Sequence, residues 1–381
     1  MVGRHRAAGE PRRWLAPVLV IVLVVGALGA SRVRSRPASA RARGASVVST
    51  TPAPPSTSSP STTLVPSVTL AAVGDTILGN GPQLPPDAGA YFEPVRAALA
   101  APVVFGNLEG TFTQAGTSKC TATSTGCYAF KDPTSYARVY RDAGFTVLNS
   151  ANNHSWDFGA PGAASTSSAL ARAGIAQAGL PGQIAVLREG SLRVAVVGFA
   201  PYYNTNNLLD VPHATALIQR AAQEANVVVV YMHAGAEGPS ADHVTRRTET
   251  FYGENRGNPY DFAHLAVRAG ADLVIASGPH VLRGLEFYRG HLIDYSLGDF
   301  TNFYDFATLG DLRYSAILRV SLDARGRFES ARFVSLLLSA DGQAHVDPTG
   351  QAASFVNGLS RADFGPAAAL VGPGGAIAPP T

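Results

Sequence analysis

The sequence predicts an α/β domain that begins at residue 68. Short apolar segments rich in β-branched residues, typical of buried strands, alternate along the chain with segments whose apolar residues recur at helical spacing. Two of the predicted helices end at Gly144 and Gly174, and glycine readily takes the left-handed conformation that closes a helix. Such alternation is the pattern of a sheet covered by helices.

The predicted elements follow one another in chain order. The strands are expected at residues 68–73, 103–105, 145–148, 184–187, 192–199, 227–232, 273–276, 285–288, 292–296, 314–322 and 327–338. The helices are expected at residues 91–100, 133–143, 161–173, 214–225 and 261–269. Residues 365–381 are rich in alanine, glycine and proline and are predicted to be disordered, so the predicted domain spans residues 68–364.

The segment before the domain has the features of a targeting sequence. Residues 1–13 are basic, and residues 14–30 form an uncharged, almost wholly apolar run. This run is slightly shorter than the about 20 residues of a spanning helix and longer than the about 7–15 of a signal-peptide core. We expect an uncleaved signal anchor with its amino end in the cytoplasm, and a cleaved signal is the alternative. Residues 31–67, rich in Arg, Ser, Thr and Pro, are expected to form an extended linker, with the domain outside the cell membrane or secreted.

The charge distribution and the cysteines bear on compartment and partners. The first 45 residues hold nine arginines and one glutamate, so the net charge of +3 leaves −5 for the other 336 residues. A mildly acidic body lacks the clustered Lys and Arg that a nucleic-acid surface needs. Cys120 and Cys127 are too widely spaced for a C-x-x-C zinc pair. In an oxidising compartment we expect a disulfide between them, with free thiols as the alternative.

Polar residues with metal-binding or acid–base chemistry stand at or just past the ends of five predicted strands. Carboxyl ends of strands in an open α/β sheet are where ligands bind, so we expect these residues to share a pocket. Carboxylate, amide and imidazole groups ligate divalent metals, and two-metal centres polarise phosphoryl oxygens. Each residue alone also fits a turn, a helix cap or a buried histidine, and only their coincidence predicts a polar site. The residues are Asp75, Glu109, Asn153 with His154, His233 and His280.

Other catalytic constellations lack their motifs. The sequence contains no G-x-S-x-G elbow of the α/β-hydrolases, which argues against a Ser-His-Asp hydrolase. No P-loop and no dinucleotide-binding glycine fingerprint follows a predicted strand. No cysteine stands at a strand end, so a thiolate zinc site is not expected.

Six motifs, in order along residues 68–322, resemble those of the CapA family of capsule-synthesis proteins. That family is associated with poly-γ-glutamate and belongs to the calcineurin-like metallophosphatase superfamily. The motifs are Val73-Gly74-Asp75, Gly106-Asn107-Leu108-Glu109, Ser150-Ala151-Asn152-Asn153-His154 with Asp157-Phe158-Gly159, His233-Ala234-Gly235-Ala236-Glu237, the run 270–282, and Tyr295-Ser296-Leu297-Gly298-Asp299-Phe300.

The resemblance implies a four-layer calcineurin-like metallophosphoesterase sandwich with two divalent or trivalent metals, Mn, Zn or Fe. Site roles are carried over by motif. Asp75 would ligate the first metal and Glu109 would bridge the two, Asn153 and His233 would hold the second, and His280 would complete the set. His154 would donate the proton to the leaving group, with Glu237 as a nearby supporting acid.

The chain departs from the pattern of the superfamily at two positions. Ile77 stands where the phosphatases usually carry a histidine, although CapA relatives commonly have an apolar residue there. Ser277 stands where relatives often have the first histidine of His-Gly-Pro-His, and a hydroxyl is the weaker ligand, so one metal position is expected to be weakened.

Two functions follow from the resemblance. One is a membrane-anchored, metal-dependent phosphoesterase that acts on a capsule or envelope polymer or its precursor. The other is a weakly active or inactive scaffold on the same fold that binds an anionic polymer for export or anchoring. Either function makes membrane proteins of capsule synthesis candidate partners.

Overall fold

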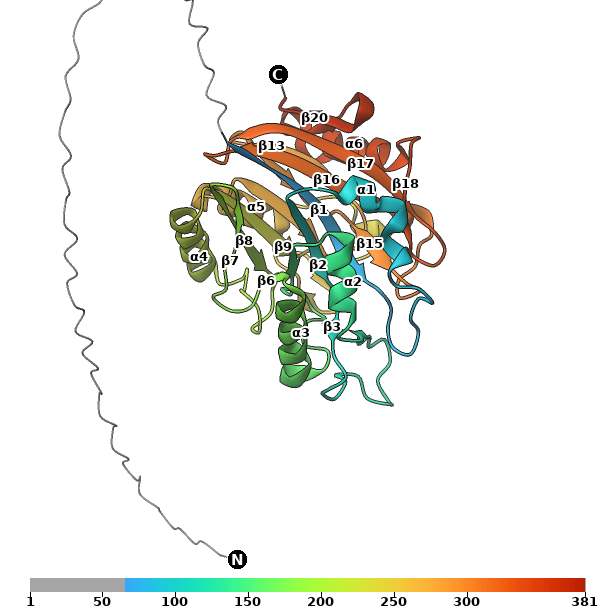
Figure 1. Ribbon diagram of the computed structural model, residues 1–381. Helices are drawn as coiled ribbons and strands as arrows, with labels where there is room; N and C mark the ends of the chain where they lie inside the picture. Colours follow the sequence, from blue (N-terminus) through green and yellow to red (C-terminus); the bar gives the residue numbers. More distant parts are fainter. Residues whose placement is uncertain (1–65, 381) are drawn as a thin grey trace, which may run out of the picture. The chain divides into compact units, whose positions relative to one another are not determined.

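The computed structural model describes residues 66–380 (Figure 1). The predicted basic amino terminus, the signal anchor at 14–30 and the linker up to residue 65 lie outside the described residues. Ser67, assigned to the linker, already begins the first strand. Among the helices of the described part, none combines the length and apolar character needed to cross a bilayer.

The larger of two main sheets is mixed and carries the first strands of the domain. Its order is β19-β20-β17-β16-β1-β2-β5-β6, with β15 beside β1 and β18 beside β17. Strands β1, β2, β5 and β6 run parallel to one another. The bounds are β1 Ser67–Ile77, β2 Val103–Leu108, β5 Val147–Asn149, β6 Ala176–Ala178, β15 Asp299–Asn302, β16 Tyr314–Asp323, β17 Phe328–Leu338, β18 Ala344–Val346, β19 Leu370–Val371 and β20 Ala376–Ala378.

The second sheet has the order β13-β14-β12-β9-β8-β7, and its four central strands are parallel. Every residue of β9 is buried, as expected for a parallel strand covered on both faces. The bounds are β7 Ala185–Glu189, β8 Leu192–Phe199, β9 Val227–His233, β12 Leu273–Ser277, β13 Leu285–Tyr288 and β14 His291–Asp294. Two-residue strands form separate pairs, β3 Thr111–Phe112 with β4 Lys131–Asp132, and β10 Thr250–Phe251 with β11 Glu254–Asn255.

The two sheets pack face to face, and helices cover their outer faces (Figure 1). Alternate residues of β1 serve the two sides, because Leu70 and Ala72 face the second sheet while Ala71 and Val73 face the helices. The rings of Phe105 and Tyr231, one from each sheet, lie 5.1 Å apart. The predicted four-layer α/β sandwich is therefore confirmed.

Helices α1 Arg96–Leu99, α2 Tyr136–Ala143 and α3 Gly159–Ala173 pack on the larger sheet. Helices α4 Val211–Glu224 and α5 Pro259–Ala269 pack on the second, and α6 Gln351–Phe364 contacts both β17 and β13. The helix predicted at 91–100 is instead a 3₁₀ turn, η1 Ala90–Val95, followed by the short α1. Pro94 within it lacks the N–H that a continuous α-helix needs. Further 3₁₀ turns are η2 Pro239–Ala241, η3 Gly310–Arg313, η4 Gly365–Ala367 and η5 Pro373–Gly375.

The prediction of a disordered tail from Gly365 is wrong for residues 365–380. Strand β20 pairs with both β19 and β17, which extends the larger sheet. Three apolar side chains of this segment, Ala369, Val371 and Ile377, are buried in the core between the sheets. Composition alone predicted disorder, but this edge of β17 supplies partners that let two short strands form.

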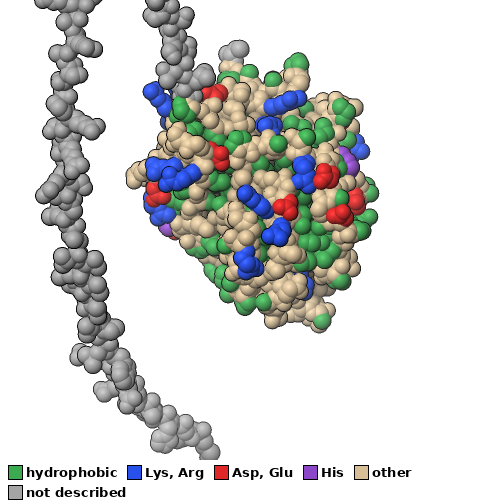
Figure 2. Space-filling model, in the orientation of Figure 1, with side chains coloured by type: hydrophobic (Ala, Val, Ile, Leu, Met, Phe, Trp, Pro, Cys, Tyr) green, Lys and Arg blue, Asp and Glu red, His purple; other side chains and the backbone are tan. Residues whose placement is uncertain are grey.

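Charged side chains are mixed on the surface that Figure 2 shows. Lys and Arg side chains are dispersed there among acidic and uncharged ones. That face of the described residues therefore carries both signs of charge.

Candidate metal centre

The carboxyl ends of parallel strands from both sheets meet at one edge of the sandwich. Asp75 lies near the end of β1, and Glu109 directly follows β2. From the second sheet, His233 is the last residue of β9, and His280 lies three residues past β12. The parallel order of the strands thus brings four of the predicted ligands to the same place.

The distances among these four side chains are those of a compact cluster. His233 Nδ1 lies 3.7 Å from Asp75 Oδ1, and His233 Nε2 lies 3.7 Å from Glu109 Oε1. His280 Nδ1 lies 3.6 Å from Asp75 Oδ2, and its Nε2 lies 4.0 Å from Glu109 Oε1. These separations are too long for hydrogen bonds and suit donor atoms that surround a common ligand.

Two buried atoms of the cluster lack partners. Glu109 Oε1 and His233 Nε2 have no hydrogen-bond partner within residues 66–380, although both side chains are fully buried. Burial, and next the Asp75 carboxylate, raises the pKa of Glu109 well above its usual value, whereas burial lowers the pKa of His233 well below its own. A cation between the two atoms would give each a partner, so the residues fit a metal.

The potential donors form two overlapping sets. One set is Asp75, Glu109 and His233, and the other is Asp75, His280 and Asp299. Within each set the donor atoms lie within 4.8 Å of one another. Asp75 belongs to both sets, whereas Glu109, the residue expected to bridge the metals, belongs to one.

Asp299 was not among the predicted ligands. It begins β15 and lies opposite Asp75 in the parallel pairing of β15 with β1. Its Oδ1 lies 2.8 Å from Nδ1 of His280, whose backbone takes the left-handed φ of 56°. Burial disfavours a charged His280, but the Asp299 carboxylate and its hydrogen bond outweigh this and raise the pKa of His280 to about 9. The sequence offered only the motif containing Asp299, without the pairing that places it.

Asn107 is a second residue that the predictions missed. Its Nδ2 donates to Asp75 Oδ1 at 2.7 Å and to Glu109 Oε2 at 3.2 Å. Its Oδ1 accepts from Asn149 Nδ2 at 2.7 Å and from Asn152 Nδ2 at 3.0 Å. Asn107 therefore holds both carboxylates in place. The two-residue period of a strand could have revealed it, since positions 107 and 109 share a face.

His154 lies beside the cluster and is held by an acid. Its Nδ1 is 2.7 Å from Asp157 Oδ2, and the Phe130 ring packs on its imidazole with centroids 4.4 Å apart. Burial lowers the pKa of His154, and the Asp157 hydrogen bond offsets this only in part. The other oxygen of Asp157 pairs with Lys119 Nζ at 2.6 Å. The imidazole is thus fixed in orientation through Nδ1.

A cavity of about 660 Å³ opens at this edge of the sandwich. The predicted residues Asn153, His154, Glu237 and His280 line it together. Asn153 contributes a buried Oδ1 with no hydrogen-bond partner among the described residues. The other lining residues are Lys119, Thr125, Gly126, Cys127, Tyr128, Phe251, Tyr252, Glu254, Arg256, Asp305, Phe306 and Ala307.

Comparison with known protein families identifies the chain's relatives. The family described as "Bacterial capsule synthesis protein PGA_cap" matches residues 69–304. The chain belongs to this family. The CapA resemblance is therefore confirmed, and the matched segment spans every residue of the donor sets, together with His154 and Glu237.

Curated members of the capsule-synthesis family match part of the chain. The PGA biosynthesis protein CapA of Bacillus subtilis (strain 168) is 30% identical over 211 residues, which are 50% of this chain and 51% of that protein. The capsule biosynthesis protein CapA of Bacillus anthracis is 30% identical over 177 residues, 43% of this chain and 41% of that protein. The chain thus spans about half the length of the curated relatives it matches.

Solved structures with some similarity include two phosphate-ester enzymes. A 5'-nucleotidase precursor from Thermus thermophilus is 16% identical, with a TM-score of 0.40, and the match covers 78% of this chain and 59% of that one. Purple acid phosphatase PPD1 from yellow lupin is 11% identical, with a TM-score of 0.37, covering 74% and 53%.

Ser277, the departure of this family member from the expected histidine, contacts Asp75. Its hydroxyl donates to Asp75 Oδ1 and also contacts the Tyr231 hydroxyl. The next residue, Gly278, donates its N–H to Asp75 Oδ2 at 3.0 Å. A Cβ at Gly278 would lie 3.0 Å from the unpartnered His233 Nε2, so this glycine keeps space open beside that nitrogen. Ser277 and Gly278 therefore orient Asp75.

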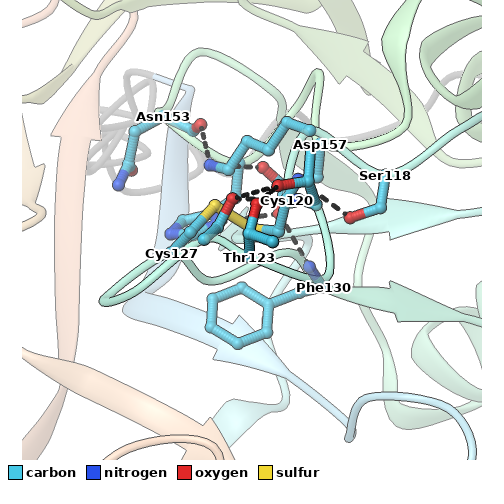
Figure 3. The surroundings of a disulfide bond; sticks show 11 residues. Ser118, Cys120, Thr123, Cys127, Phe130, Asn153 and Asp157 are labelled. Carbon is cyan, nitrogen blue, oxygen red and sulfur yellow. Dashed lines mark hydrogen bonds and ion pairs between the residues drawn. A yellow bond between two sulfur atoms is a disulfide. The ribbon is translucent and has the colours of Figure 1, made fainter.

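The loop after β3 carries a disulfide between Cys120 and Cys127, whose Cα atoms lie 5.7 Å apart. Figure 3 shows Asn153 and Asp157 beside this loop. Within the loop, the Lys119 N–H donates to the backbone oxygen of Asp157 at 2.7 Å, and Lys119 Nζ donates to that of Asn153 at 3.3 Å. The disulfide loop is thus attached to the segment that holds His154.

Proposed function

We propose that this capsule-synthesis protein is a membrane-anchored, extracytoplasmic, metal-dependent phosphoesterase. Its substrate would be a capsule or envelope polymer of the poly-γ-glutamate type, or a precursor of one. The observation that carries the proposal is the pair of buried, unpartnered atoms Glu109 Oε1 and His233 Nε2, 3.7 Å apart beside a cavity. Such a pair supports a bound cation because unpartnered buried polar atoms are costly.

The donor sets would hold two divalent or trivalent cations, Mn, Zn or Fe. Asp75, Glu109 and His233 would hold one, and Asp75, His280 and Asp299 the other. Asn153 would add its amide oxygen from the cavity wall. When bound, the metals would supply charge that neutralises phosphoryl oxygens and favours attack by water.

The chain's own acid–base groups would complete the reaction. The Nδ1 of His154 faces Asp157, which leaves Nε2 as the nitrogen that can pass a proton to the leaving oxygen. Glu237 lies 3.8 Å from His280 Nε2, which places it beside the donor sets as a nearby supporting acid. The residues therefore divide into a buried cation-binding set and a proton-transfer residue at the cavity.

The proposed location rests on the sequence. The apolar run at 14–30 and the linker after it would tether the domain outside the membrane, or release it if the signal is cleaved. The Cys120–Cys127 disulfide supports an oxidising compartment. Membrane proteins of capsule synthesis would be its partners there.

A second candidate is a scaffold that binds the polymer without cleaving it. Ser277 favours it, since the relatives' histidine would offer a nitrogen ligand where this chain offers a hydroxyl bonded to Asp75. Under this candidate the protein holds one cation or none.

Metal content and turnover of the full chain separate the two candidates. Elemental analysis should find bound metal, and an aryl phosphate should be hydrolysed. Asp75→Ala should lose both metal and turnover, whereas His154→Ala should keep the metal and lose about 10²- to 10⁴-fold in rate. His213→Ala, on the exposed face of α4, is the matched control and should change neither. Absence of turnover in the wild type, with one equivalent of metal or none, would support the scaffold.

A further inference from the structure

Two arginines are almost completely buried, and they differ in how their guanidinium groups are satisfied. Arg283 Nε donates to the Ala241 carbonyl at 2.7 Å, and its two terminal nitrogens reach Glu249 at 3.3 and 2.8 Å. Arg256, 1% exposed, pairs through Nη1 with Glu237 at 2.8 Å. Its Nε and Nη2 have no partner anywhere in residues 66–380.

The unpartnered atoms of Arg256 form one edge of the guanidinium. Nε–H and one Nη2–H point in parallel from that edge, the geometry that receives the two oxygens of a carboxylate or phosphate. A buried donor without an acceptor costs about 1–3 kcal/mol, and more when charged. Arg283 shows that this fold can satisfy a buried guanidinium completely. The edge of Arg256 that lacks hydrogen-bond partners therefore indicates a missing ligand.

The surroundings of Arg256 connect that edge to the reaction site. Arg256 lines the same cavity as His154 and His280. Its partner Glu237 also lies 3.8 Å from His280 Nε2, so this single carboxylate lies beside both residues. Glu254 is 3.6 Å from Arg256 and accepts the Tyr202 hydroxyl at 3.0 Å. Both carboxylates contact Nη1, so the Nε–Nη2 edge is the side of Arg256 that no acceptor of residues 66–380 reaches.

We infer that Arg256 binds an oxyanion of the substrate through its Nε–Nη2 edge. The inference deepens the proposed function and rests on it. It gives the substrate an anionic group, which Arg256 would hold beside the leaving oxygen that His154 would protonate. Both nitrogens are covered by neighbouring atoms. Atoms around that edge would therefore have to move to admit the ligand; Arg256 and Tyr252, at the exposed tip of the β10–β11 hairpin, line the same cavity. Phosphate and carboxylate share the required chemistry.

Direct binding tests this assignment without turnover. Calorimetric titration of the full chain, with chelator and with Mn²⁺, would use inorganic phosphate in one arm and a γ-linked glutamate trimer in the other. Arg256→Gln should raise the Kd of the matching anion at least about tenfold, the equivalent of about 1.4 kcal/mol. Arg256→Lys keeps the charge without the fork and should recover part of the affinity. Arg325→Gln makes the same change on the exposed β16–β17 turn, at the far end of β1 from Asp75, and should change nothing.

The outcomes distinguish this inference from the proposed hydrolysis. Weaker binding in Arg256→Gln supports the inference even if the wild type turns nothing over. Unchanged affinity in both Arg256 variants overturns it even if the enzyme is active. If Arg256→Gln fails to fold by thermal unfolding, the Arg256→Lys titration decides. A phosphate-only or carboxylate-only response identifies which oxyanion the edge accepts.

Discussion

Replacing Asn107 by aspartate probes the cation site with almost no change of shape. The side chain's Oδ1 keeps its bonds from Asn149 and Asn152, while the donor to Asp75 and Glu109 becomes an acceptor. Hydrogen bonds to charged groups contribute about 1.5–3 kcal/mol each, so losing two costs about 3–6 kcal/mol. Repulsion among three neighbouring carboxylates adds to this.

Cations should reverse much of that loss. A metal beside Asp75 and Glu109 would neutralise the added carboxylate and would bind the variant more tightly. Because the metal binds the folded state alone, this binding raises the free energy of unfolding. Urea unfolding with chelator and with Mn²⁺ measures the difference. Asn107→Asp should be strongly destabilised with chelator and recover at least half of the loss with metal.

Asn206→Asp is the matched control for this experiment. Asn206 is also buried, and its Nδ2 donates to the Gln183 and Gly198 carbonyls at 3.2 and 3.0 Å, so the change again removes two hydrogen bonds. The side chain of Asn206 bonds the backbone of Gly182, Gln183 and Gly198 and no donor-set residue, so metal should not rescue the variant. Equal rescue of both variants, or rescue of neither, would refute a cation site at Asp75 and Glu109.

Three further perturbations test other parts of the structure. Replacing Cys120 and Cys127 by serine should lower the free energy of unfolding by about 2 kcal/mol, because the closed loop is short, and should speed hydrogen exchange around Asp157. Burial raises the pKa of Asp294 to about 8, so the folded state holds that proton more tightly than the unfolded chain. Wild-type stability should therefore fall as pH rises from about 4 through about 8, by several kcal/mol, while Asp294→Asn shows a flatter profile in urea unfolding. Deleting residues 365–381 should destabilise the fold by at least about 3 kcal/mol in thermal unfolding, since buried side chains such as Ile377 each contribute about 1.5–3 kcal/mol. An unchanged Tm would contradict the ordered tail.

The sequence predicted the parts of the site that depend on local pattern. Residues 227–232 are all apolar, and His233 directly after them marks the end of a strand. This pattern can be recognised without knowing which strands lie beside it. Parallel packing then brings Asp75, Glu109, His233 and His280 together by a general rule of open sheets. The four candidate ligands could therefore be grouped without a structure.

Residues whose position depends on distant pairing could not be found in this way. Asp299 contacts His280 only because β15 lies beside β1. The four residues of β15 include Asp, Thr and Asn, so no hydrophobic period predicts this strand. Arg256 follows a two-residue strand, too short for any pattern. The ordered tail was not predicted for the same reason, because β19 and β20 form only against the edge of β17.

The division of the ligands between the sheets has a mechanical consequence. Asp75 and Glu109 belong to one layer, and His233 and His280 to the other. A cation shared by Glu109 and His233 would act as a removable cross-link between the two sheets at one edge of the sandwich. Removing the metal with a chelator should then let one sheet move more freely relative to the other. Core substitutions far from the cavity should weaken metal affinity in proportion to how much they let the sheets separate.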